Sequence, residues 1–175
     1  MHKLQSKPHC RFYAGIGSRE TPRHIQDKMT SIAEKISKSF CLLSGGADGA
    51  DAAFEKGAKH KQIFLPWDGF NGRFVDNDQY FVPPLNLDLV KKYHPKFASL
   101  SDACKKLMSR NSYQVLGPTL DTPVEFVLCW TKDGKASGGT GQAIRIAESR
   151  NIPVFNFQRG FEDFSRYMVM ESFLK

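Results

Sequence analysis

Residues 39–65 constrain the fold of this chain more than any other stretch, because they combine two apolar segments with a glycine-rich turn between them. Residues 40–43 form a short apolar run of the kind that buried parallel strands use. Three glycines follow within residues 44–49, and small and apolar side chains then recur at helical spacing over residues 50–58. Residues 63–65 are apolar again. This order of strand, turn, helix and strand predicts a βαβ unit, and therefore a parallel sheet.

The rest of the chain repeats this alternation. Apolar runs predict further strands, and segments with apolar residues at helical spacing predict further helices. The expected strands span residues 11–16, 113–116, 124–131 and 152–157, and the expected helices span residues 21–38, 85–93, 97–108, 142–150 and 161–174. We therefore expect an α/β fold with a Rossmann-like open, mostly parallel sheet and helices on both faces. Residues 10–175 would form this single domain, after a flexible arm over residues 1–9.

Residues 67–84 form a long segment that is rich in aromatic residues, Asn, Asp and Gly. Arg73 lies among the aromatic residues, and this combination is typical of surfaces that stack on nucleic-acid bases. The same aromatic residues would also serve to cover an apolar edge of the sheet, which is the more common role for most of them. The sequence leaves both interpretations open.

The composition excludes several classes of protein. The apolar runs are far shorter than a membrane-spanning helix, and the polar, basic start of the chain does not resemble a secretory signal, so we expect a cytoplasmic protein. The four cysteines lie far apart and the five histidines are scattered, so we expect no metal site, no disulfide framework and no cofactor. The net charge of +7 favours an anionic partner such as a nucleotide or nucleic acid, although solubility alone would also explain it.

Three glycine-rich turns, at residues 15–19, 44–49 and 137–141, each follow a predicted strand and precede a predicted helix. In an open parallel sheet the carboxyl ends of the strands share one edge, where ligands bind near the point at which the strand order reverses. Helix N-termini attract anions, and glycine lets a ligand approach the backbone closely. Together the three turns predict a phosphate site. The turn at residues 44–49, taken alone, is equally well explained by the small residues that helix–sheet packing requires.

Ser18 and Arg19 add side chains that suit a phosphate to the first turn. The planar guanidinium group of arginine presents a fixed fork of donors to phosphate oxygens. The alternative interpretation is a surface arginine beside a capping serine. Because the turn leads into a helix that begins at Thr21 and Pro22, we favour the phosphate contact.

The order of these motifs resembles the Rossmann-like domain of the DprA/Smf DNA-processing proteins, within the superfamily that also holds the LOG (lysine decarboxylase-like) phosphoribohydrolases. The resemblance extends over residues 11–157 and rests on Gly-Ser-Arg at 17–19, Ser-Gly-Gly-Ala-Asp-Gly-Ala-Asp at 44–51, Ser-Arg-Asn at 109–111 and Ser-Gly-Gly-Thr-Gly at 137–141. It implies a fold that binds a nucleotide or single-stranded DNA. The residues expected to contact this ligand are Gly17, Ser18, Arg19, Ser44, Gly45, Gly46, Ala47, Asp48, Gly49, Asp51, Arg110, Asn111, Ser137, Gly138, Gly139, Thr140 and Gly141.

The likeness to the LOG enzymes also departs at one point. Those enzymes carry glutamates just after their last glycine-rich turn, whereas here the first carboxylate after that turn is Glu148. The remaining candidates for a catalytic acid are Asp48, Asp121 and Glu125. Asp51 is better placed to brace a helix N-terminus, where a carboxylate is favoured.

Three functions remain open on this basis. The first is a protein that binds a nucleotide or single-stranded DNA through phosphate contacts. The second is a hydrolase that acts on the N-glycosidic bond of a nucleotide, with a carboxylate as its acid or base. The third is a sensor of a nucleotide-derived signal. A homodimer is compatible with all three, although no residue identifies its interface.

Overall fold

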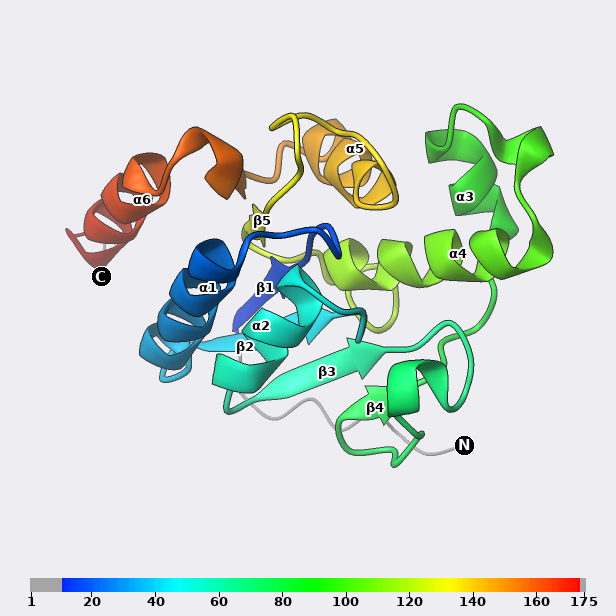
Figure 1. Ribbon diagram of the computed structural model, residues 1–175, viewed down its shortest axis with the longest axis horizontal. Helices are drawn as coiled ribbons and strands as arrows, with labels where there is room; N and C mark the ends of the chain where they lie inside the picture. Colours follow the sequence, from blue (N-terminus) through cyan, green and yellow to red (C-terminus); the bar gives the residue numbers. More distant parts are fainter. Residues whose placement is uncertain (1–10, 174–175) are drawn as a thin grey trace.

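The computed structural model describes residues 11–173, so the expected arm over residues 1–9 lies outside the described residues. Six parallel strands form one sheet in the order β4-β3-β2-β1-β5-β6 (Figure 1). The strands are β1 Arg11–Gly15, β2 Phe40–Ser44, β3 Lys61–Phe64, β4 Tyr80–Phe81, β5 Val127–Cys129 and β6 Val154–Asn156. Across residues 11–173, no helix has both the length and the apolar character needed to cross a membrane.

In the described part of the chain, six α-helices cover the two faces of this sheet. They are α1 Arg23–Ile36, α2 Ala50–Gly57, α3 Leu87–Tyr93, α4 Asp102–Leu116, α5 Gly141–Ser149 and α6 Glu162–Phe173. Helices α1, α2 and α6 contribute to the core on one face, whereas α4 and α5, with α3 packed beside them, form the core on the other. Strand residues alternate between the two cores, so that Tyr13 belongs to the first and Ala14 to the second. The predicted Rossmann-like α/β fold is confirmed.

The strand order reverses between β1 and β5. From β1 the chain builds outward through β2, β3 and β4, and it then returns to add β5 and β6 on the other side of β1. Connections that leave β1 and β5 therefore diverge and leave a crevice at the carboxyl edge. Backbone hydrogen bonds of 3.0 Å from Ile16 N to Leu128 O and from Ser18 N to Trp130 O continue the β1–β5 pairing into this crevice.

Helix α4 corrects the expectation for residues 97–116. A 3₁₀ turn at Phe97–Ser99 is followed by one continuous helix, so residues 109–111 do not interrupt a helix and residues 113–116 are not a strand. All residues from 108 to 116 are buried, and the one-sided apolar pattern by which a helix is recognised is therefore lost there. The expected strand at residues 124–131 is also shorter in the structure, since β5 spans only Val127–Cys129.

The start of α1 differs from the expected capping arrangement. Helix α1 begins at Arg23 with Pro22 in the N-cap position, and no side chain caps it. Thr21, the expected capping residue, instead donates its hydroxyl to Ser18 O at 2.6 Å. This bond stabilises the turn after β1 rather than the helix.

Residues 67–84 pack onto the edge of the sheet through a short strand that the sequence did not predict. This strand, β4, pairs with β3. Glu55 of α2 holds the segment in place, because it forms an ion pair of 2.8 Å with Arg73 and accepts a hydrogen bond of 2.6 Å from the hydroxyl of Tyr80. Phe70 is buried, whereas Trp67 and Phe74 are exposed. Some of the aromatic residues of this segment therefore serve to cover the edge of the sheet.

Gly57 allows α1 and α2 to pack closely on the same face of the sheet. A Cβ atom at Gly57 would collide with the backbone oxygen of Thr30 in α1. Thr30 also links the helices directly, because its hydroxyl donates a hydrogen bond of 2.9 Å to Ala53 O. The close packing fixes the N-terminus of α2 relative to the turn that precedes α1.

We expect Gly57→Ala to lower the free energy of unfolding by about 1–3 kcal/mol, the usual cost of overpacking, even though alanine is the better helix former. Chemical denaturation measures this difference. Lys56→Ala, at the neighbouring exposed position, is the matched control and should stay within about 0.5 kcal/mol of the unsubstituted protein. A Gly57→Ala variant as stable as the control would contradict the tight helix contact.

Candidate functional site

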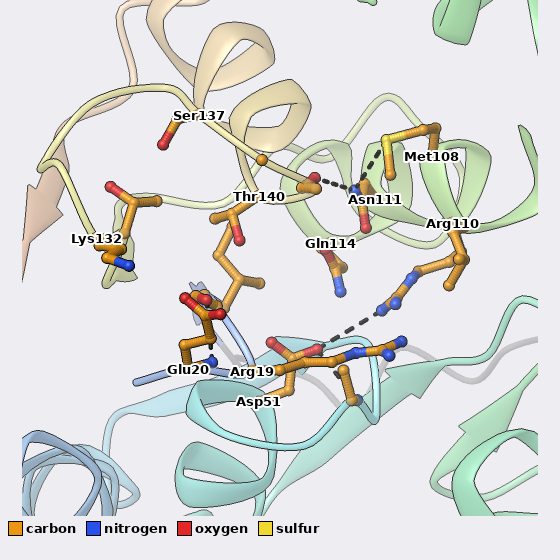
Figure 2. Close-up of a pocket in the computed structure, with 18 of the residues that line it drawn as sticks. Arg19, Glu20, Asp51, Met108, Arg110, Asn111, Gln114, Lys132, Ser137 and Thr140 are labelled. Carbon is orange, nitrogen blue, oxygen red and sulfur yellow. Dashed lines mark hydrogen bonds and ion pairs between the residues drawn. The ribbon is translucent and has the colours of Figure 1, made fainter. Parts of the chain in front are cut away.

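A cavity of about 530 Å³ lies at the carboxyl edge of the sheet, where the strand order reverses (Figure 2). Its volume is within the range of roughly 300–1,000 Å³ that is typical of small-ligand sites. Four segments line it: the turn after β1, the start of α2 with its preceding turn, one face of α4, and the connection from β5 to α5. The lining residues are Ile16, Gly17, Ser18, Arg19, Glu20, Ala47, Asp51, Cys104, Leu107, Met108, Arg110, Asn111, Gln114, Thr131, Lys132, Ser137, Gly138, Gly139 and Thr140.

The turn after β1 is fixed tightly between its neighbours. A Cβ atom at Gly17 would lie 2.7 Å from the Cβ of Ala50 and 2.8 Å from Trp130 O, so only glycine fits there without a shift. Ser18 O accepts a hydrogen bond of 3.3 Å from Ala50 N, the first residue of α2. The turn after β1 thus covers part of the N-terminus of α2 and presents Arg19 at the mouth of the cavity.

Asp51 and Arg110 form a buried ion pair at the base of the cavity. Arg110 Nη1 lies 3.6 Å from Asp51 Oδ2, and the two residues are only 6% and 3% exposed. Burial raises the pKa of Asp51 to about 6, while the charge of Arg110 and three backbone N–H groups of the surrounding turns partly oppose that rise. Burial likewise lowers the pKa of Arg110, and the Asp51 carboxylate opposes that fall. Each buried charge therefore depends on the other.

The Asp51 carboxylate, in the first turn of α2, also links this helix to the turn that precedes it. It accepts a hydrogen bond of 3.4 Å from Ala47 N in the preceding turn. A carboxylate in this position is favoured by the helix dipole. The negative charge that the α2 N-terminus attracts is thus supplied by the protein itself.

A second guanidinium group, that of Arg19, turns toward the same part of the cavity as Arg110 (Figure 2). After burial, which has the largest effect, the charge of Arg19 also lowers the pKa of Arg110. Among the described residues, Arg110 Nε finds no hydrogen-bond partner although it is buried. Two converging guanidinium groups above one buried carboxylate leave a positive potential that a phosphate would neutralise.

Gln114 holds the buried arginine from one turn farther along α4. In the amide orientation that satisfies its neighbours, it accepts hydrogen bonds from Arg110 Nη1 at 3.0 Å and from Gly45 N at 2.9 Å, and it donates to Asn111 Oδ1 at 3.2 Å. A Cβ atom at Gly45 would collide with the Arg110 guanidinium, so this glycine leaves room for the arginine rather than for a ligand. Arg110 is therefore held in one orientation from two sides.

Helix α4 also supports the turn before α5. Asn111 Nδ2 donates a hydrogen bond of 2.9 Å to Gly139 O, and Gln142 Nε2, in α5, donates one of 2.7 Å to Met108 O. These bonds bring the N-terminus of α5 to the cavity, with residues 137–140 along its wall. The N-terminal N–H groups of such a helix are suited to bind an anion.

The structure brings most of the expected ligand-contacting residues to this cavity. Those that line it are Gly17, Ser18, Arg19, Ala47, Asp51, Arg110, Asn111, Ser137, Gly138, Gly139 and Thr140. Those that do not are Ser44, Gly45, Gly46, Asp48, Gly49 and Gly141.

Several of the residues outside the cavity have packing roles. The Ser44 hydroxyl donates a hydrogen bond of 2.6 Å to Gly15 O and so links β2 to β1. Gly49 has a φ of +79°, and a Cβ atom there would lie 2.5 Å from Ser18 O. A Cβ atom at Gly141 would lie 2.7 Å from Ala136 O. Much of the glycine content of the turns thus serves close backbone packing.

None of the three candidate catalytic carboxylates is among the residues that line the cavity. Asp48 is exposed and accepts a hydrogen bond of 2.9 Å from Asn71 Nδ2. Glu125 pairs at 2.5 Å with Arg11, the first residue of β1, so it lies at the opposite edge of the sheet. Asp121 is in the turn that enters β5 from that same edge, where it accepts a hydrogen bond from the Thr119 hydroxyl. Within residues 11–173, no three His, Cys, Asp or Glu side chains are grouped to hold a metal ion.

Several cavity residues were not expected from the sequence, notably Glu20, Gln114 and Lys132. Gln114 lies three and four residues after Asn111 and Arg110, which places it on the same face of a helix but not of a strand. A helix prediction for residues 109–116 would therefore have identified it. Glu20 directly follows the Gly-Ser-Arg turn, and Lys132 directly follows the strand expected at residues 124–131. Both positions therefore predicted a place at the carboxyl edge of the sheet.

Solved structures of other proteins share the fold of this chain, whereas sequence comparisons find no match. Neither a family model nor a curated protein matches the sequence. The chain is similar to a structure of DNA processing protein A from Helicobacter pylori, described for its single-stranded DNA binding mode, with a TM-score of 0.53 and 18% identity over 83% of this chain. It is also similar to DNA processing protein A (DprA) from Streptococcus pneumoniae, with a TM-score of 0.51 and 17% identity over 93% of this chain.

These similarities show that the chain shares its Rossmann-like fold with the DprA structures. The chain spans 64% of the Helicobacter protein structure and 56% of the Streptococcus one, which is less than two thirds of each. At these levels of identity, the likeness concerns the fold. The expected resemblance to the DprA domain is therefore confirmed for the fold.

Replacing Arg110 by methionine would leave the Asp51 carboxylate buried without its cation. We expect this variant to lose about 3–5 kcal/mol in the free energy of unfolding at pH 8. The loss should shrink toward pH 4, because the folded-state pKa of Asp51 lies above its unfolded value and the cost of burying the charge disappears once both states are protonated.

Denaturation of the Arg110→Met variant at pH 8 and pH 4 measures this dependence, and the double variant Asp51→Asn/Arg110→Met is its control. The double variant should recover much of the lost stability at pH 8, because it has no unpaired carboxylate. An equal loss of unfolding free energy at both pH values, with no recovery in the double variant, would show that the ion pair does not stabilise the buried charge of Asp51.

Proposed function

We propose that this protein binds single-stranded DNA, with a phosphate of the strand held by Arg19 and Arg110 at the carboxyl edge of the sheet. The convergence of these two guanidinium groups above one buried carboxylate is the observation that carries the proposal. Arginine pairs with phosphate oxygens through two parallel hydrogen bonds, which a point charge does not provide. The DprA-like fold and the net charge of +7 both support it.

The two arginines would divide the work of binding. Arg110 is fixed by Asp51 and Gln114, so it pays little conformational entropy when a phosphate arrives. Arg19 is exposed and would close on the phosphate from the mouth of the cavity. Residues 137–140, at the N-terminus of α5, would add backbone N–H donors, and exposed Lys132 would add a further positive charge. Phosphate binding by these glycine-rich turns is part of the proposal.

Cleavage of an N-glycosidic bond has less support than binding. Of the described residues, the carboxylates that line the cavity are Glu20 and Asp51, and Asp51 is engaged by Arg110 and by backbone N–H groups. The activity of the LOG enzymes, the function of a nucleotide sensor and the formation of a homodimer stay predictions from the sequence. The absence of released base after incubation with nucleoside monophosphates would exclude the hydrolase.

Substitution of Arg19 tests the proposed phosphate contact. We expect Arg19→Ala to weaken binding of a labelled oligo(dT) about tenfold or more, in line with the loss of a charge-assisted hydrogen bond. The slope of log affinity against log salt should also fall by about 0.7, the value for one phosphate contact to a single strand. Fluorescence anisotropy over a series of salt concentrations measures both quantities.

The matched control is Arg23→Ala, which removes an exposed arginine four positions along the chain. Arg23 forms a surface ion pair of 3.2 Å with Asp27 and does not line the cavity. Its loss should alter affinity far less than the loss of Arg19. Equal effects of the two substitutions would reduce the binding to general charge attraction and contradict a specific site.

A further inference from the structure

A second cavity, of about 510 Å³, lies on the other side of α4 from the first. Its walls come mainly from the aromatic segment 67–84, and they are largely apolar, with basic groups on α4. The residues that matter for its chemistry are Trp67, Val82, Leu85, Lys106, Ser109 and Arg110. Of these, Trp67, Val82 and Leu85 are exposed apolar side chains, which soluble proteins seldom gather in one place without a partner.

Arg110 belongs to both cavities. The face of α4 that carries Met108 and Asn111 lines the first cavity, and the face that carries Lys106 and Ser109 lines the second. Arg110 lies at the boundary between the two faces. The two cavities are therefore neighbours that share one arginine.

An aromatic row connects the floor of the first cavity to the wall of the second. The Arg110 guanidinium lies 5.6 Å from the centroid of the Phe70 ring, over its face. The Phe70 ring in turn meets Trp67 edge to face, with centroids 5.3 Å apart and an angle of 90° between the planes. Phe70 is buried, and the Trp67 indole is thus held in place while the residue stays 37% exposed.

We propose that the second cavity is a base-stacking subsite for a nucleotide that neighbours the one bound at Arg19 and Arg110 on the same DNA strand. The base would stack on Trp67 between Val82 and Leu85, and the adjoining phosphate would lie between Arg110 and Lys106. This inference rests on the proposed function and deepens it, because it makes the ligand a polynucleotide rather than a single nucleotide.

The charges around the second cavity favour a nucleotide over an apolar partner. Lys106 and Arg110 stand beside the apolar walls, which matches the combination of base and phosphate in a strand. Asp68 is the opposing charge, and its carboxylate accepts a hydrogen bond of 2.8 Å from Val75 N within the segment. The shared Arg110 places the cavity next to the proposed phosphate site, as neighbouring nucleotides of one strand would require.

Tryptophan fluorescence during titration with oligo(dT) tests this subsite directly, because the chain has only two tryptophans. Trp130 is 5% exposed and donates a hydrogen bond of 2.9 Å to Gln158, so it is shielded from a stacking base. We expect the strand to quench Trp67, and we expect Trp67→Phe to remove the quenching while retaining much of the affinity. Trp67→Ala should weaken binding by roughly 5- to 150-fold, the range for one stacked base.

Phe74→Ala is the matched control, since Phe74 is an aromatic residue of the same segment, is 66% exposed and lines neither cavity. It should leave both affinity and quenching unchanged. Thermal melting establishes that each variant is folded. If Trp67→Ala does not fold, the comparison of the unsubstituted protein with Trp67→Phe decides: quenching lost in the variant supports the subsite, and equal quenching in both overturns it.

The remaining outcomes separate this inference from the proposed function. Strand binding that depends on Arg19 but is unchanged in Trp67→Ala would overturn the second subsite alone. Failure of the unsubstituted protein to bind the strand would overturn both. A dimer that light scattering detects, and that Trp67→Ala dissociates, would assign the cavity to a second copy of the chain and overturn the subsite.

Discussion

The buried ion pair between Arg110 and Asp51 is the interaction on which the rest of the site depends. Two charges are almost completely buried, and each would be costly to bury alone. The pair joins α4, which covers one face of the sheet, to the start of α2, which covers the other. It therefore fixes two helices at the carboxyl edge as well as one side chain. A ligand that binds Arg110 meets an arginine already fixed in orientation.

Around this ion pair, the glycine-rich turns have a different role from the phosphate binding that the sequence predicted for all three. Gly45 leaves the space that the Arg110 guanidinium fills, and Gly17 lets the turn after β1 approach Trp130 O. Asp51, rather than a bound phosphate, supplies the negative charge at the N-terminus of α2. What is left for a ligand is the part of the cavity between Arg19, Arg110 and the N-terminus of α5. The turns thus shape the site mainly by packing, and α4 with its arginine supplies much of its polarity.

The sequence predicted the sheet, the reversal edge and most of the cavity lining, because strands, glycines and helix starts carry local signals. It failed at α4, where burial on all sides removes the apolar periodicity and residues 113–116 resemble a strand. Because of that error, the sequence did not predict that Gln114 lines the cavity. Asp121 and Glu125 were expected as catalytic acids because the order of residues along the chain does not show where a side chain lies in the fold. In the structure, both lie at the edge of the sheet opposite the cavity. A local sequence pattern does not predict which side chains from distant segments lie close together in the fold.

Amide chemical-shift mapping by NMR during titration with unlabelled oligo(dT) tests the central claim most directly. Binding at the reversal edge predicts the largest shifts at the backbone amides of residues 17–19 and 137–141, together with the guanidinium signals of Arg19 and Arg110. Amides near Asp121 and Glu125, at the other edge of the sheet, should stay unchanged. Shifts that concentrate at that opposite edge, or that spread evenly over the basic surface, would contradict a strand-binding site built around the Arg110–Asp51 pair.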